Sequence, residues 1–289
     1  IQMILSLSFT AVAVIGMLFL GIALLLRFSS SANTMAADNT KRILSQVNFN
    51  LDRYLHNMMQ VSDTVYYRVV KNADLEQQEK KEELQNALEL LYAKDRDVLV
   101  SLAIFDRDGD LIAATPLADL KNSVMPSREE WFTTAMERIE NMHFSTPHVQ
   151  NLFIDPDIRY HWVVSLSRQV ELTRGGRTQS GVLLVDMNFS RIEQICKDIS
   201  LANGQGYLYL IDSAGEIIYH PRQQLIYAGL QEENNIVAAD YSDGTHTETF
   251  LSQRRQVTIK TVGYTGWKLV GVVPAETLRD NYSQLLWFA

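Results

Sequence analysis

The sequence lacks the residue patterns that mark disulfide-stabilised, nucleic-acid-binding and metal-binding proteins. It contains a single cysteine, Cys196, so no disulfide can form within the chain. Acidic residues outnumber basic ones by 34 to 26, and the net charge of −8 argues against a nucleic-acid partner. His143, His148 and His161 do not have the spacing of metal ligands, so we expect no metal site.

Motifs for catalysis are also missing. The chain has no nucleophile elbow, no glycine-rich phosphate loop and no paired carboxylates in a recognisable context. The acidic stretch Asp106–Asp110 lacks the glycine and the glutamate that a calcium loop needs, because Leu111 and Leu117 stand at those positions. We therefore expect neither a catalytic residue nor a cofactor.

Charged residues are absent from the first 26 positions, and this is the one long apolar run in the chain. It exceeds the roughly 20 residues that a helix needs to cross a bilayer, and it is longer than the apolar core of a signal peptide. The chain opens on isoleucine, and residues 280–289 turn apolar and aromatic. We therefore expect a fragment that begins in one membrane span and ends at the start of another, with residues 28–280 extracytoplasmic.

Two similar stretches indicate an internal duplication. SLAIFDRDGDLIAATP contains Asp106 and Gly109, and LYLIDSAGEIIYHP contains Asp212 and Gly215 at the matching places. A strand, a tight turn in which glycine supplies a positive φ, and a second strand explain both copies. We expect two units of the same plan, the first with the larger insertion between its hairpin and its closing strands.

A long helix is predicted over about 40–70. Its apolar residues recur every seven positions, with a second series three positions later: Leu44, Leu51, Met58 and Val65, then Val47, Tyr54 and Val61. Such a seam fits a helix packed on its own domain or a dimer interface, and the sequence leaves both open. A second amphipathic helix is predicted over about 75–94.

The remaining pattern predicts antiparallel sheets with helices on one face. A capping box of Ser127 and Glu130 predicts a helix over 128–141, and another helix is expected over 189–199. The predicted strands cover 98–105, 111–114, 160–169 and 181–187 in the first unit, and 207–211, 216–219, 245–251, 255–262 and 267–273 in the second. The predicted fold class is α+β, with two tandem PAS-like antiparallel modules on a long N-terminal helix.

Several phrases resemble the double Cache sensory domain of bacterial transmembrane receptors. REEWFTTA is similar to the arginine-and-aromatic helix of the membrane-distal module, GVLLVDMNFSRI to its closing strand, and TGWKLVGVVPAETL to the last strand of the membrane-proximal module. The resemblance implies a transmembrane helix over 1–27, a stalk and second helix over 28–95, a distal module over 96–200, a proximal module over 201–279, and a second transmembrane helix starting at 280–289.

The resemblance also implies a function. HFSTPHVQNLF, HWVVSLSRQVE and HPRQQLIYAGL are similar to sensor histidine kinases, so we expect the input domain of such a kinase, anchored in the cell membrane, acting as a homodimer and sensing a small molecule. The alternatives are the sensor of a methyl-accepting chemoreceptor or a diguanylate cyclase, and a membrane-tethered structural module without a ligand.

In amino-acid-binding members of that family, an arginine two residues before the tryptophan holds the ligand carboxylate, a tyrosine seven before it assists, and a closing-strand aspartate takes the amine. Asp186 matches this aspartate. Glu129 and Val124 occupy the other two positions relative to Trp131, with Arg128 displaced by one. An amino-acid ligand is therefore disfavoured.

Six residues are the candidate contacts of a ligand in the first unit: Arg128, Trp131, Phe132, Tyr160, Trp162 and Asp186. Alternation along a strand places Tyr160 and Trp162 on one face, where aromatic rings can form either core or pocket wall. Asp186 shares a face with apolar residues, so its carboxylate needs a partner, either backbone amides of the helix near Phe189 or a cationic ligand group.

Overall fold

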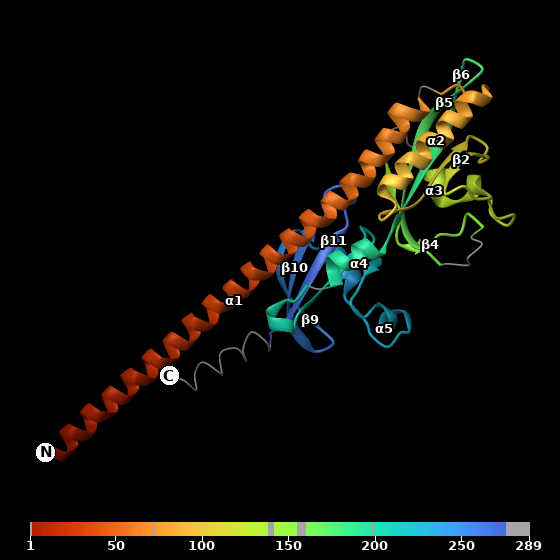
Figure 1. Cartoon of the computed structure of the whole chain (residues 1–289). Coiled ribbons are helices and arrows are strands. Elements are labelled where there is room, and N and C mark those ends of the chain that lie inside the picture. The colour runs from red at the N-terminus through yellow and green to blue at the C-terminus, as the bar shows by residue number, and fades with distance from the viewer. Residues whose placement is uncertain (1, 72, 138–141, 155–159, 198, 276–289) are drawn as a thin grey trace.

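The computed structural model describes residues 2–71, 73–137, 142–154, 160–197 and 199–275, and gives only the backbone of 2–13, 25–26 and 28–33. A single helix, α1 (Gln2–Thr64), runs the length of the molecule and continues as a π-helical turn, Val65–Val70. Two sheets lie one after the other along it and leave its N-terminal part uncovered (Figure 1). We call the sheet farther from the N-terminus the distal module and the nearer one the proximal module.

The two modules have the same strand order. The distal sheet runs β2-β1-β6-β5-β3, with β4 also paired to β5, and the proximal sheet runs β8-β7-β11-β10-β9. All pairings between these strands are antiparallel. The distal strands are β1 (Leu99–Asp106), β2 (Leu111–Thr115), β3 (His143–Phe144), β4 (His148–Val149), β5 (Trp162–Arg174) and β6 (Arg177–Asn188). The proximal strands are β7 (Tyr207–Ile211), β8 (Ile217–Tyr219), β9 (Gly244–Phe250), β10 (Gln253–Thr261) and β11 (Lys268–Pro274). This architecture confirms the predicted fold class of tandem antiparallel modules on a long helix.

The helices differ from the prediction in number and extent. They are α2 (Gln78–Asp95), α3 (Glu130–Glu137), α4 (Ser190–Lys197), α5 (Gln223–Tyr227) and α6 (Asn235–Asp240). The predicted capping box is wrong: Ser127 lies inside a 3-10 turn, Pro126–Arg128, and the extended Glu129 separates this turn from α3. Residues 138–141 of the predicted helix lie outside the described residues. Neither α5 nor α6 was expected.

The duplicated turn has the same geometry in both modules. In each, one carboxylate oxygen accepts backbone N–H bonds from the residues two and four positions later, at 3.0 and 2.9 Å for Asp106 and at 2.9 and 2.7 Å for Asp212. Gly109 and Gly215 have φ of 90° and 88°, a conformation that glycine adopts without steric cost. The acids are therefore turn-forming residues, as the repeat predicted.

The apolar seam of α1 packs on the chain's own sheets. Leu44, Leu51, Met58 and Val65 are fully buried and belong to one cluster that joins α1 and α2 to both sheets. Because the chain itself covers these side chains, the dimer interpretation of this seam is wrong. The helix approaches the strand backbone closely at Gly271 of β11, where an added Cβ would lie 2.7 Å from Leu44 Cδ1.

The opposite face of each sheet has a separate core. The distal face packs against α3 through Ala103, Phe132 and Leu184, among others. The proximal face packs against α6 through Tyr209, Ala238 and Val270. Each module therefore has one face committed to the long helix and a second face on which a site can form.

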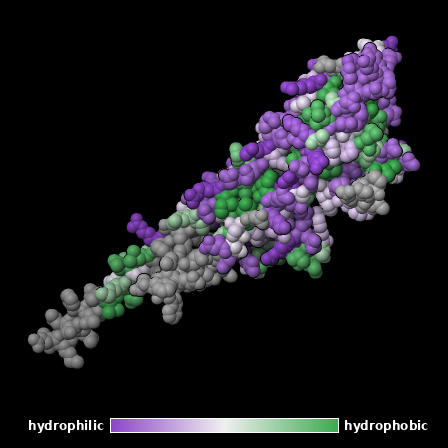
Figure 2. Space-filling model, in the orientation of Figure 1, coloured by the Kyte–Doolittle hydropathy of each residue, from purple (hydrophilic) through white to green (hydrophobic). Residues whose placement is uncertain are grey.

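The expected membrane spans are only partly described. No helix within the described ranges is long and apolar enough to cross a bilayer. The side chains of 2–13 in the first expected span, and all of the second at 280–289, lie outside the described residues. Along the uncovered part of α1, the side chains between residues 14 and 24 are exposed and largely apolar (Figure 2).

Candidate functional site

Asp186 is a buried carboxylate at the centre of the distal sheet. It lies on β6 directly opposite Ser101 of β1 and Ser165 of β5, on the face away from α1. The two serine hydroxyls donate hydrogen bonds to its two oxygens, at 2.6 and 2.5 Å, and its side chain is almost inaccessible to solvent. The expectation that amides of the helix near Phe189 satisfy this carboxylate is therefore wrong; two neighbouring strands do so.

Burial away from water raises the pKa of Asp186, and the hydrogen bonds from Ser101 and Ser165 and the nearby His148 offset this only in part. His148 lies on β4, with Nε2 3.4 Å from the Ser165 hydroxyl oxygen. The sequence singled out neither serine as a partner of Asp186. Alternation along β1 and β5 was the available signal, because it places both hydroxyls on the otherwise apolar face of Asp186.

A cavity of about 70 Å³ lies beside Asp186. Its lining includes Glu129 just before α3 and Trp131 in its first turn, together with His148, Ser165 and Asp186 from the sheet. Trp131 packs against Phe105 with ring centroids 5.3 Å apart. The cavity thus has two carboxylates, an imidazole and an aromatic wall, and its lining contains no lysine or arginine in the described part of the chain.

The structure brings together only part of the predicted set. Trp131 and Asp186 line the same cavity, whereas Phe132 is buried in the core between α3 and the sheet. Arg128 is exposed and does not line the cavity. Tyr160 and Trp162 line a different groove, at the junction of the two modules.

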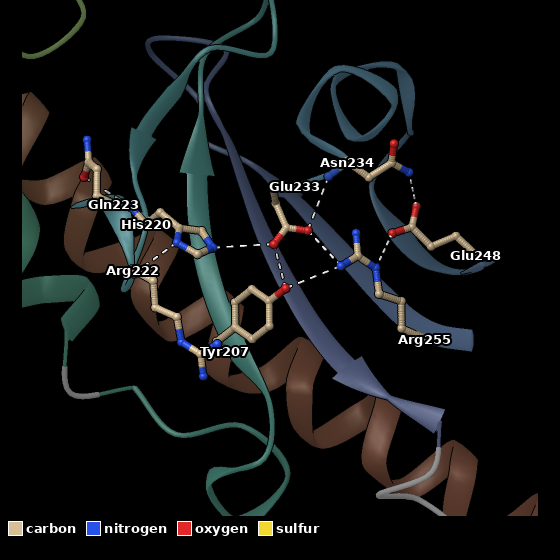
Figure 3. A network of polar contacts seen from close by, with 8 residues as sticks. All are labelled: Tyr207, His220, Arg222, Gln223, Glu233, Asn234, Glu248 and Arg255. Carbon is tan, nitrogen blue, oxygen red and sulfur yellow. Dashed lines mark hydrogen bonds and ion pairs between the residues drawn. The ribbon is translucent and has the colours of Figure 1, made fainter. Parts of the chain in front are cut away.

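The proximal module has its own buried polar cluster (Figure 3). At its centre, Glu233 accepts a hydrogen bond from the Tyr207 hydroxyl at 2.6 Å and forms an ion pair with Arg255 at 2.7 Å. The other side of the guanidinium donates from Nε to Glu248 at 2.6 Å, and Glu248 also accepts from the Asn234 amide at 2.7 Å. The side chains of Glu233, Glu248 and Arg255 are all less than a tenth exposed.

His220 completes the proximal cluster. Its Nδ1 accepts the backbone N–H of Arg222 at 3.0 Å, so the ring proton of the neutral form lies on Nε2, which faces Glu233 at 3.5 Å. Burial alone would raise the pKa of Glu233, but His220, Tyr207 and Arg255 together hold it below its usual value. No pattern in the sequence predicted this cluster.

The two polar sites occupy matching places. Aligning Asp106 with Asp212 and following the cross-strand pairs through each sheet gives an equivalent position in the other module for each paired residue. The equivalent pairs are Ser101 with Tyr207, Asp186 with Val272, Ser165 with Val257, Val163 with Arg255, and His148 with Glu248. The acid of the distal site therefore has a valine as its proximal counterpart, and the arginine of the proximal site has a valine as its distal counterpart.

The architecture and the duplicated turn agree with the comparison to protein families: residues 28–281 match the Cache domain. The chain belongs to the Cache domain family. The ligand-binding domain of the amino-acid chemoreceptor PctC of Pseudomonas aeruginosa, solved in complex with GABA, has this fold, with a TM-score of 0.63 at 17% identity over 82% of this chain and 99% of that one. The sensory domain of the chemoreceptor Tlp3 of Campylobacter jejuni, solved with isoleucine, gives a TM-score of 0.65 at 12% identity over 87% and 97% of the two chains.

Two curated relatives are similar over most of this Cache chain. The methyl-accepting chemotaxis protein TlpA of Bacillus subtilis is 22% identical over 78% of this chain, and a probable methyl-accepting chemotaxis protein of Bacillus thuringiensis is 21% identical over 90%. The chain spans about a third of their length, 31% and 36% respectively. These relatives match the chemoreceptor alternative, and they lend no support to the histidine kinase expectation.

Proposed function

We propose that this Cache chain is the extracytoplasmic sensor of a transmembrane receptor and that its distal cavity binds a small ligand through a cationic amine. The observation that carries the proposal is Asp186, a carboxylate buried beside a cavity, whose hydrogen bonds come from two neutral hydroxyls and whose pKa stays raised although His148 lies nearby. Such a carboxylate is costly to ionise unless a positive charge lies near it. An ammonium group in the cavity would supply that charge.

The composition of the lining supports this ligand class. Glu129 and Asp186 are acidic, and Trp131 offers an aromatic ring, which also attracts cations. The solved neighbours whose ligands are GABA or isoleucine bind compounds with an amino group. In this chain the position two before Trp131 is Glu129, and the exposed Arg128 does not line the cavity. We therefore propose an amine without an α-carboxylate in place of an amino acid.

The size of the cavity limits what enters without movement. About 70 Å³ accommodates a few water-sized groups, which suits an amino head group and little more. A longer ligand requires the start of α3 to move away from the sheet. Binding would then favour one of two positions of α3, and the differential affinity for these positions is the free energy available for signalling.

Different observations support the membrane anchor and the type of receptor to which this sensor belongs. The uncharged run at the start of α1 supports an anchor, and the chemotaxis proteins among the relatives support a chemoreceptor output. The phrases similar to sensor histidine kinases keep a kinase as the second candidate. A homodimer is proposed for either output, through a face of α1 other than its buried seam.

Calorimetric titration of the whole chain in detergent micelles tests the ligand class. The probes are ethylamine, putrescine and histamine as amines, and glycine and isoleucine as amino acids. We expect an amine to bind, Asp186→Asn and Trp131→Ala to abolish its binding, and the exposed Asp108→Asn to leave it unchanged. Binding should also release protons wherever free Asp186 is protonated, which titrations in buffers of different ionisation enthalpy measure. An amine that still binds after both site substitutions would rule out this cavity.

A further inference from the structure

A second groove lies where the distal and proximal modules meet, and it has a volume of about 440 Å³. Tyr160 and Trp162 at the start of β5 and Asn188 and Glu193 near α4 form its distal wall. Tyr227 of α5 stands on the proximal wall. The volume is within the range of small-molecule sites, which occur preferentially at domain interfaces.

Aromatic side chains on both walls are unusually exposed. Tyr160 is 80% exposed, Tyr227 66% and Trp162 45%, although each could bury much more apolar area. Exposed aromatic rings around a hollow are typical of a binding surface, whereas single exposed apolar residues are common. The groove thus offers ring faces to a ligand from two modules.

The polar lining points to a ligand without charge. Among the described lining residues there is no lysine or arginine, and the one carboxylate, on Glu193, is exposed and screened by water. The other polar groups include the amides of Asn188, Gln223 and Gln224. An amide both donates and accepts hydrogen bonds, as a hydroxyl group does.

We propose that this groove binds a neutral sugar. A sugar ring presents an apolar C–H face that can lie on Trp162 or Tyr227, and a rim of hydroxyls that can bond to the amides. The described lining offers an anion no lysine or arginine and only the imidazole of His161, and it offers an organic cation only the screened carboxylate of Glu193. The proposed site is separate from the Asp186 cavity, because the two have no lining residue in common.

The proximal wall of the groove is fixed to the buried polar cluster. The backbone N–H of Arg222 bonds to His220 Nδ1 at 3.0 Å, and the N–H of Gln223 bonds to the His220 carbonyl at 3.1 Å. The Gln223 amide in turn donates to the Tyr227 hydroxyl at 2.8 Å. A sugar held between Trp162 and Tyr227 would therefore connect the proximal cluster to the distal sheet and favour the arrangement of modules that it bridges.

Saturation-transfer NMR on the whole chain in detergent micelles tests the proposal, with glucose, galactose, rhamnose, xylose, maltose and cellobiose as probes. We expect at least one sugar to bind. Trp162→Ala and Tyr227→Ala should each weaken its binding about tenfold. Tyr227→Phe, which keeps the ring, should stay within about twofold. Tyr264→Ala, an exposed tyrosine outside the groove, and Asp186→Asn should have no effect.

Three results would overturn the proposal. The first is that none of the six sugars binds. The second is that sugar binding is lost in Asp186→Asn and kept in Tyr227→Ala, which would assign the sugar to the distal cavity. The third is that Tyr227→Ala changes the mass of the particle in solution while no sugar binds, which would make the groove an interface between copies. Amine binding at the distal cavity is measured separately, so it can fail without affecting this outcome.

Discussion

The distal and proximal modules use one scaffold to hold two different polar sites. Both have the same strand order, the same aspartate-glycine turn and a polar cluster at the same end of the face away from α1. The distal carboxylate is satisfied by two hydroxyls and borders a cavity. The proximal carboxylates are satisfied by an arginine of the chain itself.

This difference shows how one duplicated scaffold can hold two different polar sites, because Asp186 and Arg255 each have a valine as counterpart in the other module. Arg255 provides in the proximal module the positive charge that we propose a ligand provides in the distal one. Among the described residues of this cluster, Arg255 Nη2 and His220 Nε2 are buried without a hydrogen-bond partner, although His220 Nε2 lies 3.5 Å from Glu233. The proximal site is therefore a structural ion-pair network, and the distal site has a place left for a partner.

Removing the internal cation is the largest change that the comparison predicts. Arg255→Met leaves Glu233 and Glu248 buried without their counter-charge, and we expect the free energy of unfolding at pH 7 to fall by about 3–5 kcal/mol. Urea unfolding followed by circular dichroism measures this. The matched control is the exposed neighbour Arg254→Met, expected within about 0.5 kcal/mol of the parent. Equal effects of the two substitutions would mean that the network contributes nothing.

Substituting the equivalent glycines of the two turns tests whether both modules lose the same stability. Gly109→Ala and Gly215→Ala both place a side chain at positive φ, which costs roughly 1–2 kcal/mol. An added Cβ would lie 2.8 Å from the Ser127 backbone N at the first site and 3.0 Å from Ile236 Cα at the second. We expect the distal variant to lose more stability. If urea unfolding showed a larger loss of stability for Gly215→Ala than for Gly109→Ala, the contact with Ser127 would not determine the cost.

The two carboxylates predict opposite pH dependences. The pKa of Asp186 is raised above its usual 3.8, so the folded state binds its proton more tightly and stability falls as pH rises through the interval between the two values. Asp186→Asn should remove this fall and raise the unfolding free energy at pH 7. Unfolding free energies of both proteins between pH 3 and pH 8 measure this effect. If the substitution left the pH dependence unchanged, ionisation of Asp186 would not cost stability.

Glu233 provides the matching proximal measurement. Because its pKa is held below the usual 4.5, its contribution to stability is present above that pH and is lost as pH falls through the lower value. Glu233→Gln should therefore destabilise the protein at pH 7 and make the loss on acidification smaller. If Asp186→Asn and Glu233→Gln changed the unfolding free energy at pH 7 in the same direction, the two carboxylates would not differ in the way proposed.

The smallest expected effect concerns the acid that the two turns do not share. Asp108 has Ala214 as its counterpart, and its side chain is exposed. Asp108→Ala should change stability by less than about 0.5 kcal/mol, and millimolar calcium should not shift the melting temperature of either protein. A calcium-dependent shift that disappears in the variant would show that this turn is an ion site after all.

Features with a local signal were predictable from the sequence. An aspartate followed three residues later by glycine specifies its own turn, so both copies were found, and the seven-residue repeat located the long helix. Tyr160 and Trp162 line one groove, but His161 between them lines it too, so alternation along the strand did not separate the three. The sequence pattern also gave no indication of where the proximal module contacts the distal one, so the groove between them was not predicted.

The polar partners were hidden because they depend on strand register. Ser101, Ser165 and Asp186 come from three strands, and the chain gives no local sign that they are opposite one another. His220, Glu233 and Arg255 likewise meet only once β8, β10 and the segment between them are in place. The short helices α5 and α6 lack a long amphipathic pattern, so they too were missed.

The close approach at Gly271 has a mechanical consequence. At this point the Leu44 side chain rests directly on strand backbone, so an axial shift of α1 alone would press it against peptide atoms. We therefore expect this stretch of α1 and the sheet beneath it to move together as one rigid body. Motion started at the distal end would then reach the N-terminal end more readily as a tilt of that combined body than as a piston stroke of the helix alone.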